Sequence, residues 1–281
     1  MNEFNDPRDR FTLQAEREFR PSVRPIYRSI ERRPEQPEHL ASCLLLSIDG
    51  IAIVCTAAHV ADNSPKHTLY IGGEAGVGVR LVYIPEGAFS GTIAPAGDRD
   101  LDYFDIAFWP LPASAIAALG AVVFLDSSRL TDQMPTENRL YTAMGYPRSR
   151  NKTKVNHSKK SIDTRISMYT ANVEQRPALA AELGISGADH LFLSGETRSF
   201  AGNSGRVNTF GPRGLSGGAL LDLGEFAPPE FVKTDSQTNA LLSGMIIEYY
   251  EEHRALMAVR ISLIVASIRR ALAQDGLGAK R

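Results

Sequence analysis

Apolar residues occur along this chain mostly in short continuous or alternating runs, and turn-forming residues separate these runs. Alternation with a period of two is typical of a strand with one buried face, whereas a helix repeats every 3.6 residues. Little helical periodicity occurs between residues 39 and 262. Many short strands with turn signals between them predict an all-β sandwich or barrel. We expect strands at residues 40–47, 51–55, 69–71, 79–84, 106–111, 140–145, 167–171, 190–194, 219–223, 241–248 and 255–261.

The two ends of the chain lie outside this pattern. Residues 1–38 mix arginines and acidic residues with apolar residues and prolines, and we interpret them as a partly helical arm that packs across the β-structure. A regulatory or partner-binding extension is the alternative. Near the C-terminus, Ile264, Ile268 and Leu272 fall on one helical face opposite Arg269, which predicts a terminal helix.

A serine lies between glycines in the segment Gly214-Leu215-Ser216-Gly217-Gly218. Glycine permits backbone conformations that are closed to other residues and leaves N–H groups accessible around the hydroxyl. A hydroxyl is a weak nucleophile until a neighbouring base takes its proton. A reactive serine here would therefore need an imidazole and a group that orients it.

The chain offers both groups upstream of the serine. His59 ends the run Val54-Cys55-Thr56-Ala57-Ala58, and Asp105 opens the apolar run Ile106-Ala107-Phe108-Trp109. A carboxylate at the start of a buried strand needs a hydrogen-bond partner, because an unpaired buried charge is costly. The second nitrogen of the histidine ring can be that partner. The order along the chain is His, Asp, Ser.

Other residues compete for these roles. Asp98, Asp100 and Asp102 lie in the same acidic segment as Asp105, and only the apolar strand that follows Asp105 favours it. Ser204 also lies among glycines, but no long apolar run follows it, which indicates a loop.

The three motifs Thr56-Ala57-Ala58-His59, Asp105-Ile106-Ala107 and Gly214-Leu215-Ser216-Gly217-Gly218 together resemble the catalytic motifs of trypsin-like serine peptidases. The resemblance covers roughly residues 39–262. It implies two six-stranded antiparallel β-barrels with the site in the cleft between them. The domains would be an N-terminal arm (1–38), a first barrel with His59 and Asp105 (39–130), a second barrel with Ser216 (131–262), and a C-terminal helix and tail (263–281).

The resemblance also implies a role for each site residue. Ser216 would attack the scissile carbonyl, His59 would take its proton, and Asp105 would hold the imidazole in the correct tautomer. The backbone N–H groups of Gly214 and Ser216 would form the oxyanion hole. Leu215 stands where animal digestive enzymes carry an aspartate that pairs with a newly cut N-terminus, so the closer comparison is with bacterial and viral members that need no such cleavage.

The substrate pocket is also assigned by resemblance. Phe210, six residues before the serine, would lie at its base, and Ile246 and Ile247 would form one wall. An apolar lining disfavours a charged P1 side chain, so we expect a small or apolar P1 residue rather than Arg or Lys. Glu248 would favour a basic P1 residue if it turned into the pocket.

These motifs predict a serine endopeptidase that acts through an acyl-enzyme. One alternative is a catalytically silent or latent peptidase fold that serves as a binding module. Another is an α/β-hydrolase esterase, because the segment also fits the pattern Gly-x-Ser-x-Gly. That enzyme would need an acid and a histidine after the serine, which leaves Asp222 or Asp235 with His253, and it would need a helix where the apolar run after Ser216 predicts a strand.

Composition fits a globular enzyme. The chain has 281 residues, 43% of them hydrophobic and 22% charged, with a net charge of −1. The balanced charge and the absence of a long apolar stretch or a signal peptide predict a cytoplasmic protein that binds neither membranes nor nucleic acid. A polypeptide substrate is what the resemblance implies. The sequence leaves open whether the protein has a regulatory protein partner. No histidine or cysteine spacing suggests a metal site, and we expect no cofactor.

The two cysteines bear on the predicted cytoplasmic location, because disulfides form in oxidising compartments. A two-residue turn at Asp49-Gly50 would pair Ile48 with Ile51, and this register points Cys43 and Cys55 to opposite faces of the hairpin. They could not form a disulfide, and free thiols suit a reducing compartment.

A run of basic residues, Arg148 to Arg165, contains no aromatic residue. Nucleic-acid binding usually combines basic charge with stacking aromatics. We interpret the run as a solvated loop, with guidance of an acidic substrate or partner as the alternative.

Overall fold

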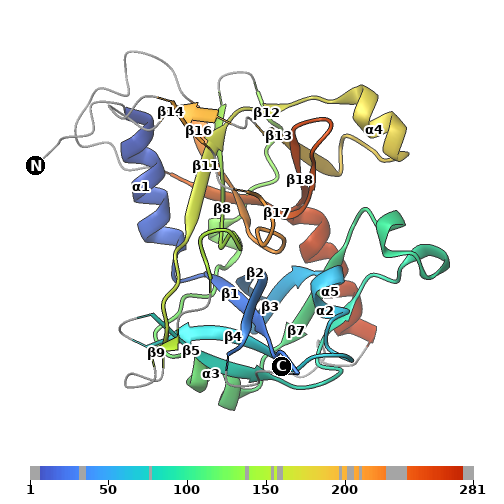
Figure 1. Cartoon of the computed structure of the whole chain (residues 1–281). Coiled ribbons are helices and arrows are strands. Elements are labelled where there is room, and N and C mark those ends of the chain that lie inside the picture. The colour runs from blue at the N-terminus through green and yellow to red at the C-terminus, as the bar shows by residue number, and fades with distance from the viewer. Residues whose placement is uncertain are drawn as a thin grey trace, which may run out of the picture.

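The computed structural model describes residues 7–31, 36–75, 78–136, 139–152, 155–156, 161–195, 198–200, 206–208, 211–225 and 239–274. Two large antiparallel sheets form the molecule, one above the other in Figure 1. The first has the strand order β6-β7-β3-β2-β1-β4-β5-β10-β9. Its strands are β1 (Val23–Arg28), β2 (Glu38–Ile48), β3 (Ile51–Ala57), β4 (Leu69–Glu74), β5 (Val79–Ile84), β6 (Ser90–Gly91), β7 (Ile106–Pro110), β9 (Val155–Asn156) and β10 (Ser161–Ile162).

The second sheet has the order β11-β8-β16-β17-β18-β13-β12. Its strands are β8 (Arg139–Gly145), β11 (Ser167–Ala171), β12 (Val173–Glu174), β13 (His190–Ser194), β16 (Ala219–Glu225), β17 (Leu241–Tyr250) and β18 (Ala255–Arg260), and a separate hairpin joins β14 (Arg198–Phe200) to β15 (Arg206–Asn208). The helices are α1 (Pro7–Phe19), α2 (Ala58–Ala61), α3 (Ala113–Leu119), α4 (Pro177–Leu183) and α5 (Ile261–Gln274), with short 3-10 turns at Pro95–Gly97, Arg99–Leu101 and Ser127–Arg129. Within the described ranges, each large sheet has six strands of at least five residues.

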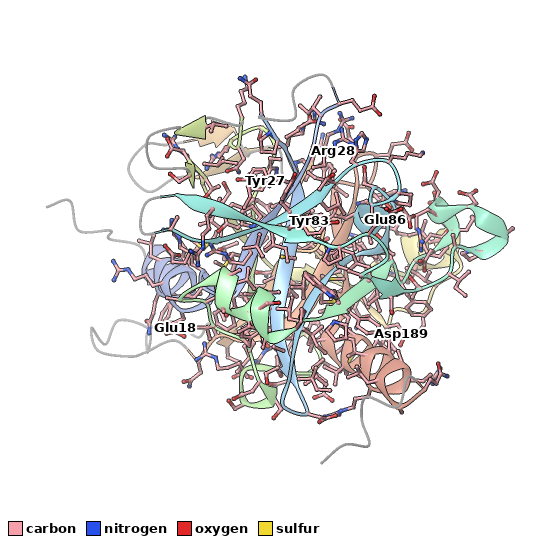
Figure 2. All side chains as sticks on the ribbon, turned by 90° about the horizontal axis from the view of Figure 1, so that it is seen from below. Glu18, Tyr27, Arg28, Tyr83, Glu86 and Asp189 are labelled. Atoms are coloured by element: carbon pink, nitrogen blue, oxygen red, sulfur yellow. The ribbon has the colours of Figure 1, made fainter. Side chains whose placement is uncertain are left out.

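The first sheet takes one of its six long strands from the segment that we assigned to an N-terminal arm. Residues 23–28 form β1, which pairs with β2 on one side and with β4 on the other. Figure 2 shows Tyr27 and Arg28 of β1 beside the β4–β5 hairpin that carries Tyr83. The first sheet therefore begins before residue 38, where we had ended the arm. The sequence pattern did not show β1 because arginines and a proline interrupt its apolar residues.

Pro25 fits inside β1 because its neighbour on β4 is a glycine. A Cβ at Gly72 would lie 2.7 Å from the Pro25 ring, so the ring occupies the space that a side chain would need. The Arg24 side chain donates a hydrogen bond to the Gly72 carbonyl at 2.6 Å. These contacts join sequence segments that no local pattern connects.

The basic segment also crosses between the sheets. Residues 155–156 and 161–162, which we placed in the second barrel, form β9 and β10 at the edge of the first sheet. Ile162 is buried there against Tyr27 and Val79, which gives this segment an apolar reason to cross over.

The β2–β3 hairpin has the register that the turn predicted. Ile48 pairs with Ile51 and Leu44 with Cys55, and both turn residues, Asp49 and Gly50, have positive φ angles as a type I′ turn requires. The prediction for this hairpin is therefore confirmed.

The two thiols lie in different parts of the core as a result. Cys43 packs among residues such as Ile26 and Val54, whereas Cys55 packs with Phe108 and the second-sheet residue Met245. Both cysteines are free, and burial raises the pKa of each thiol.

The helices at the two ends connect the sheets. Helix α1 packs against β11 and β16 of the second sheet (Figure 1). Phe19 at its end is fully buried. Helix α5 follows β18, buries Ile264 and Ile268, and reaches the first sheet through an ion pair between Arg269 and Asp49. In the part of the chain that is described, no helix has the length and apolar character needed to cross a membrane.

Candidate active site

His59 lies in the first turn of α2, directly after β3 ends. The first N–H groups of a helix have no partner within the helix. Here Asp105 satisfies two of them, because its carbonyl accepts from the Ala58 N–H at 2.9 Å and its carboxylate accepts from the His59 N–H at 2.8 Å. The residue before the helix, Ala57, has no side chain that could do this.

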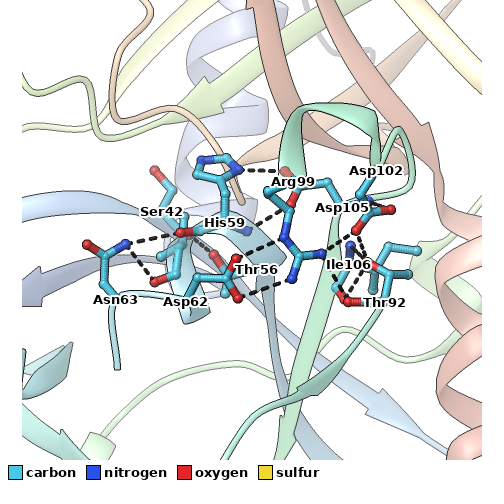
Figure 3. Close-up of polar contacts among 11 residues, drawn as sticks. Ser42, Thr56, His59, Asp62, Asn63, Thr92, Arg99, Asp102, Asp105 and Ile106 are labelled. Atoms are coloured by element: carbon cyan, nitrogen blue, oxygen red, sulfur yellow. Dashed lines mark hydrogen bonds and ion pairs between the residues drawn. The ribbon is translucent and has the colours of Figure 1, made fainter. Parts of the chain in front are cut away.

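The same carboxylate contacts the histidine ring. Nδ1 of His59 lies 2.6 Å from Oδ2 of Asp105 (Figure 3). Asp105 is buried and has φ +45°, a left-handed conformation that is uncommon for a residue other than glycine. Such backbone strain is often found at functional sites. Among the neighbouring aspartates that competed with Asp105 in the sequence, none is bonded to His59 in the described part of the chain.

A second layer of polar groups holds Asp105 and α2 together. Asp102 accepts from the Asp105 N–H at 3.1 Å, and its other oxygen accepts from the Thr92 hydroxyl and from Arg99. Arg99 also forms a two-pronged ion pair with Asp62 at the end of α2 (Figure 3). Sequence reasoning treated Asp102 only as a rival of Asp105 and missed Arg99, because neither residue stands in a recognisable motif.

The charges around His59 change its proton affinity. Burial opposes protonation, but the hydrogen bond and negative charge of Asp105 outweigh it, and Glu248 and Asp62 add to them. The pKa of His59 is therefore raised above its ordinary value. A protonated form stabilised in this way is what a general base needs after it has accepted a proton.

The peptide bond before Gly214 directs the Gly214 N–H group away from Arg148. Within a trans peptide the carbonyl and the N–H point in opposite directions. The Arg213 carbonyl accepts from the Arg148 N–H at 2.7 Å, so the N–H of Gly214 points away from Arg148. Gly214 has φ +94°, and a Cβ there would lie 2.8 Å from the Arg148 nitrogen, so this position requires glycine.

Ser216 has its N–H group turned in the same manner. The Leu215 carbonyl accepts from the Gly218 N–H at 2.7 Å, which directs the N–H of Ser216 the opposite way. Among the described residues, the N–H groups of Gly214 and Ser216 donate to no protein acceptor. Two unoccupied donors beside a serine hydroxyl are suited to binding an oxyanion.

Leu215 shows why the loop cannot depend on a charged partner at that position. Its side chain is buried in the core of the second sheet, among Tyr141, Leu220 and Ile246. Packing, rather than an ion pair, holds this side of the loop.

The two sheets meet closely at Gly217. A Cβ at this residue would lie 2.0 Å from the Ser42 carbonyl oxygen and 2.4 Å from Oγ1 of Thr56. Gly217 also has φ +81°. Glycine is therefore required where the segment 214–218, called the serine loop below, touches β2 and β3.

His59, Asp105 and Ser216 line one cavity of about 1020 Å³, and residues of both sheets contribute to its lining. The structure thus brings the three sequence-predicted residues to one place. No hydrogen bond between the side chains of His59 and Ser216 is found among the described contacts, and such bonds are often long before substrate binds.

The predicted pocket wall also faces this cavity. Ile246 and Ile247 are buried in β17 and line it, together with Met257 of β18. The pairing of β17 with β18 is irregular between residues 246 and 248. Phe210 and Ser204 lie outside the described residues.

Glu248 lines the cavity as well. Burial raises the pKa of its carboxyl, and the charges of Asp105 and Asp100 add to this, whereas His59 acts in the opposite direction. Its carboxylate is therefore close enough to His59 to influence the ring. The sequence left open whether Glu248 turns into the pocket, and its side chain lines this cavity.

The basic segment is anchored rather than fully solvated at its described ends. Asn151 is buried and bonds to the Pro147 and Arg165 carbonyls and to the Arg165 N–H. Arg148 pairs with Glu38, and both Arg148 and Lys152 line the cavity. Lys154, Lys159 and Lys160 lie outside the described residues.

Asp222 and His253, the two described residues that an esterase could use, do not come together. Asp222 is buried in a two-pronged ion pair with Arg139, whereas His253 lies against Glu182. Strand β16, and not a helix, follows Ser216. Asp235 lies outside the described residues.

No cluster of three or more histidine, cysteine, aspartate or glutamate side chains suitable for a metal occurs within the described ranges.

No protein-family model and no curated protein sequence matches this chain. The crystal structure of the serine endoprotease from Yersinia pestis matches with a TM-score of 0.51 at 13% identity, over 94% of this chain and 67% of that chain. Glu endopeptidase in complex with MPD matches with a TM-score of 0.48 at 14% identity, over 90% of each chain. A structure concerned with the Sesbania mosaic virus VPg protein matches with a TM-score of 0.46 at 15% identity, over 87% of this chain and 88% of that chain.

At these identities the likeness concerns the fold. The chain has the trypsin-like two-barrel fold with a C-terminal helix, and the resemblance that the three sequence motifs predicted is confirmed at that level.

Proposed function

We propose that the protein is a serine endopeptidase that works through Ser216, His59 and Asp105. The observation that supports this most is the contact of Asp105 with both the backbone and the ring of His59, in one cavity with Ser216. A solved structure of similar fold is a serine endoprotease, which agrees with this choice.

In the proposed mechanism, Oγ of Ser216 attacks the scissile carbonyl while His59 takes its proton. Asp105 keeps the proton on Nδ1, so that Nε2 is the acceptor. The N–H groups of Gly214 and Ser216 bind the developing oxyanion. His59 then donates the proton to the leaving amine, and water releases the acyl group by the reverse sequence.

For specificity we propose a small or apolar P1 residue. Ile246, Ile247 and Met257 give the cavity an apolar wall, which disfavours a charged side chain without a partner. The carboxylate of Glu248 favours the rival choice of a basic P1 residue, since it lines the same cavity.

Labelling with a fluorophosphonate probe tests the proposed function. We expect labelling of the wild-type chain and none of Ser216→Ala, and full labelling of the control Ser128→Ala, a serine in an exposed turn that bonds Asp126. Labelling that survives Ser216→Ala would exclude Ser216 as the nucleophile. An unlabelled wild-type protein would instead favour a binding module.

A further inference from the structure

Ser42 connects the first sheet to the serine loop through both its backbone and its side chain. It lies on β2 and is fully buried. Its N–H donates to the Ser216 carbonyl at 2.9 Å, and its hydroxyl donates to the Gly214 carbonyl at 3.0 Å. Its own carbonyl accepts from the Thr56 hydroxyl at 2.8 Å.

The hydroxyl of Ser42 has a second partner on the opposite side. It accepts a hydrogen bond from the Tyr146 N–H at 2.9 Å, just after β8 ends. The hydroxyl therefore joins three segments: β2, the turn after β8 and the serine loop. Because Tyr146 is buried, its N–H has no access to water in place of this acceptor.

These bonds fix the carbonyl groups of the two residues whose N–H groups donate to no described protein acceptor. The Gly214 carbonyl is held by the Ser42 hydroxyl, and the Ser216 carbonyl by the Ser42 N–H. The Gly214 carbonyl belongs to the 214–215 peptide, whereas the Gly214 N–H belongs to the 213–214 peptide, which Arg148 holds. Glycine at 214 has a wide choice of backbone conformations, so rotation between these two peptides would be easy if the Gly214 carbonyl lost its bond to Ser42. Leu215 offers no polar group that could replace it.

We propose that Ser42 is a positioning residue. Its hydroxyl holds the carbonyl of the 214–215 peptide and so restricts rotation at Gly214, which keeps the N–H groups of Gly214 and Ser216 in place for an oxyanion in the uncleaved chain. The inference rests on the proposed function. It explains how the loop keeps its conformation with a leucine at 215, where no charged contact can hold it.

Ser42→Ala removes the hydroxyl and keeps the backbone bond to Ser216. We expect kcat for p-nitrophenyl acetate, per fluorophosphonate-labelled site, to fall about 10- to 100-fold, which is less than the 10²- to 10³-fold loss of a whole oxyanion donor. KM should change less than threefold. Phenylboronic acid, which places an oxygen in the oxyanion site when it binds the serine, should bind more weakly by a similar factor.

A second pair of variants covers the case in which Ser42→Ala does not fold. Ser42→Thr keeps the hydroxyl and should retain most of the activity, whereas Ser42→Cys has a weak donor and should behave like the alanine variant. Ser47→Ala, on the same strand, is the matched control with unchanged kinetics.

The outcomes separate the two proposals. Equal kcat and boronate affinity in wild type and Ser42→Ala, or equal losses in the threonine and cysteine variants, would overturn the role of Ser42 and leave the peptidase intact. A wild-type protein that neither labels nor turns over ester would overturn the proposed function and this role with it.

Discussion

At the scale of single residues, Asp105 completes the start of α2 and holds the His59 ring with one carboxylate. The sequence indicated Asp105 through the apolar strand after it. It contained no sign of the left-handed backbone or of the contacts to Asp102, because these depend on how the 92–105 loop packs against α2. The position of the ring therefore follows from tertiary contacts.

The pH dependence of activity should reflect this environment. His59 must be neutral to accept a proton, and its pKa is raised, so the acid limb of kcat/KM should lie above the pKa of a free imidazole. Asp105→Asn removes the charge that favours the protonated ring. It should move the limb to lower pH and reduce kcat by roughly 10⁴-fold. Rates of p-nitrophenyl ester hydrolysis between pH 5 and 9 would measure both effects.

Glu248→Gln serves as the comparison for that experiment. It should move the limb to lower pH by a smaller amount, since Glu248 follows Asp105 among the groups that raise the pKa of His59. An acid limb that stays in place in both variants would contradict the assignment of His59 as the base.

The P1 preference is a further prediction at this scale. A peptide library should show cleavage after small or apolar residues, and Glu248→Gln should leave that profile unchanged. Cleavage mainly after Arg or Lys that disappears in Glu248→Gln would show instead that this carboxylate defines the pocket.

At the scale of elements, the strands follow the apolar pattern closely. Residues 79–84, 167–171 and 190–194 form strands with the predicted bounds, and the Asp49-Gly50 turn sets the register of its hairpin. Strand β16 carries the buried pair of Asp222 with Arg139 of β8. A carboxylate in a run of apolar residues gives no indication of its partner, which lies 83 residues away.

Asp222→Asn should strongly reduce stability without changing the chemistry at Ser216. Removal of one partner of a buried ion pair leaves the other charge uncompensated and costs about 3–5 kcal/mol. Chemical denaturation would measure the loss. Asp49→Asn is the matched control, because its pair with Arg269 is exposed and contributes about 0–1 kcal/mol. Equal stabilities of the two variants would contradict the importance of the buried pair.

At the scale of the whole molecule, the N-terminal segment is part of the fold. Strand β1 lies between β2 and β4, and the fully buried side chains of Phe19, Val23 and Ile26 belong to the core. Each such side chain contributes about 1.5–3 kcal/mol of burial. A chain without them would lose much of the 5–15 kcal/mol by which domains of this kind are stable.

Deletion of residues 1–28 should therefore abolish cooperative thermal unfolding and fluorophosphonate labelling. Deletion of residues 1–6 leaves every described residue in place and should preserve both. A folded, labelled protein after the longer deletion would show that this segment is an accessory arm after all.

The sequence alone determined most of the long strands, the hairpin register, the opposite faces of Cys43 and Cys55, and the set of residues worth testing as a site. These depend on side-chain alternation and on turn residues, which act over a few positions. Only the tertiary structure decided the place of β1, the network from Arg99 to Asp105, and the contact of Ser42 with the serine loop 172 residues away. Such contacts depend on the packing of two whole sheets, and no local pattern encodes that.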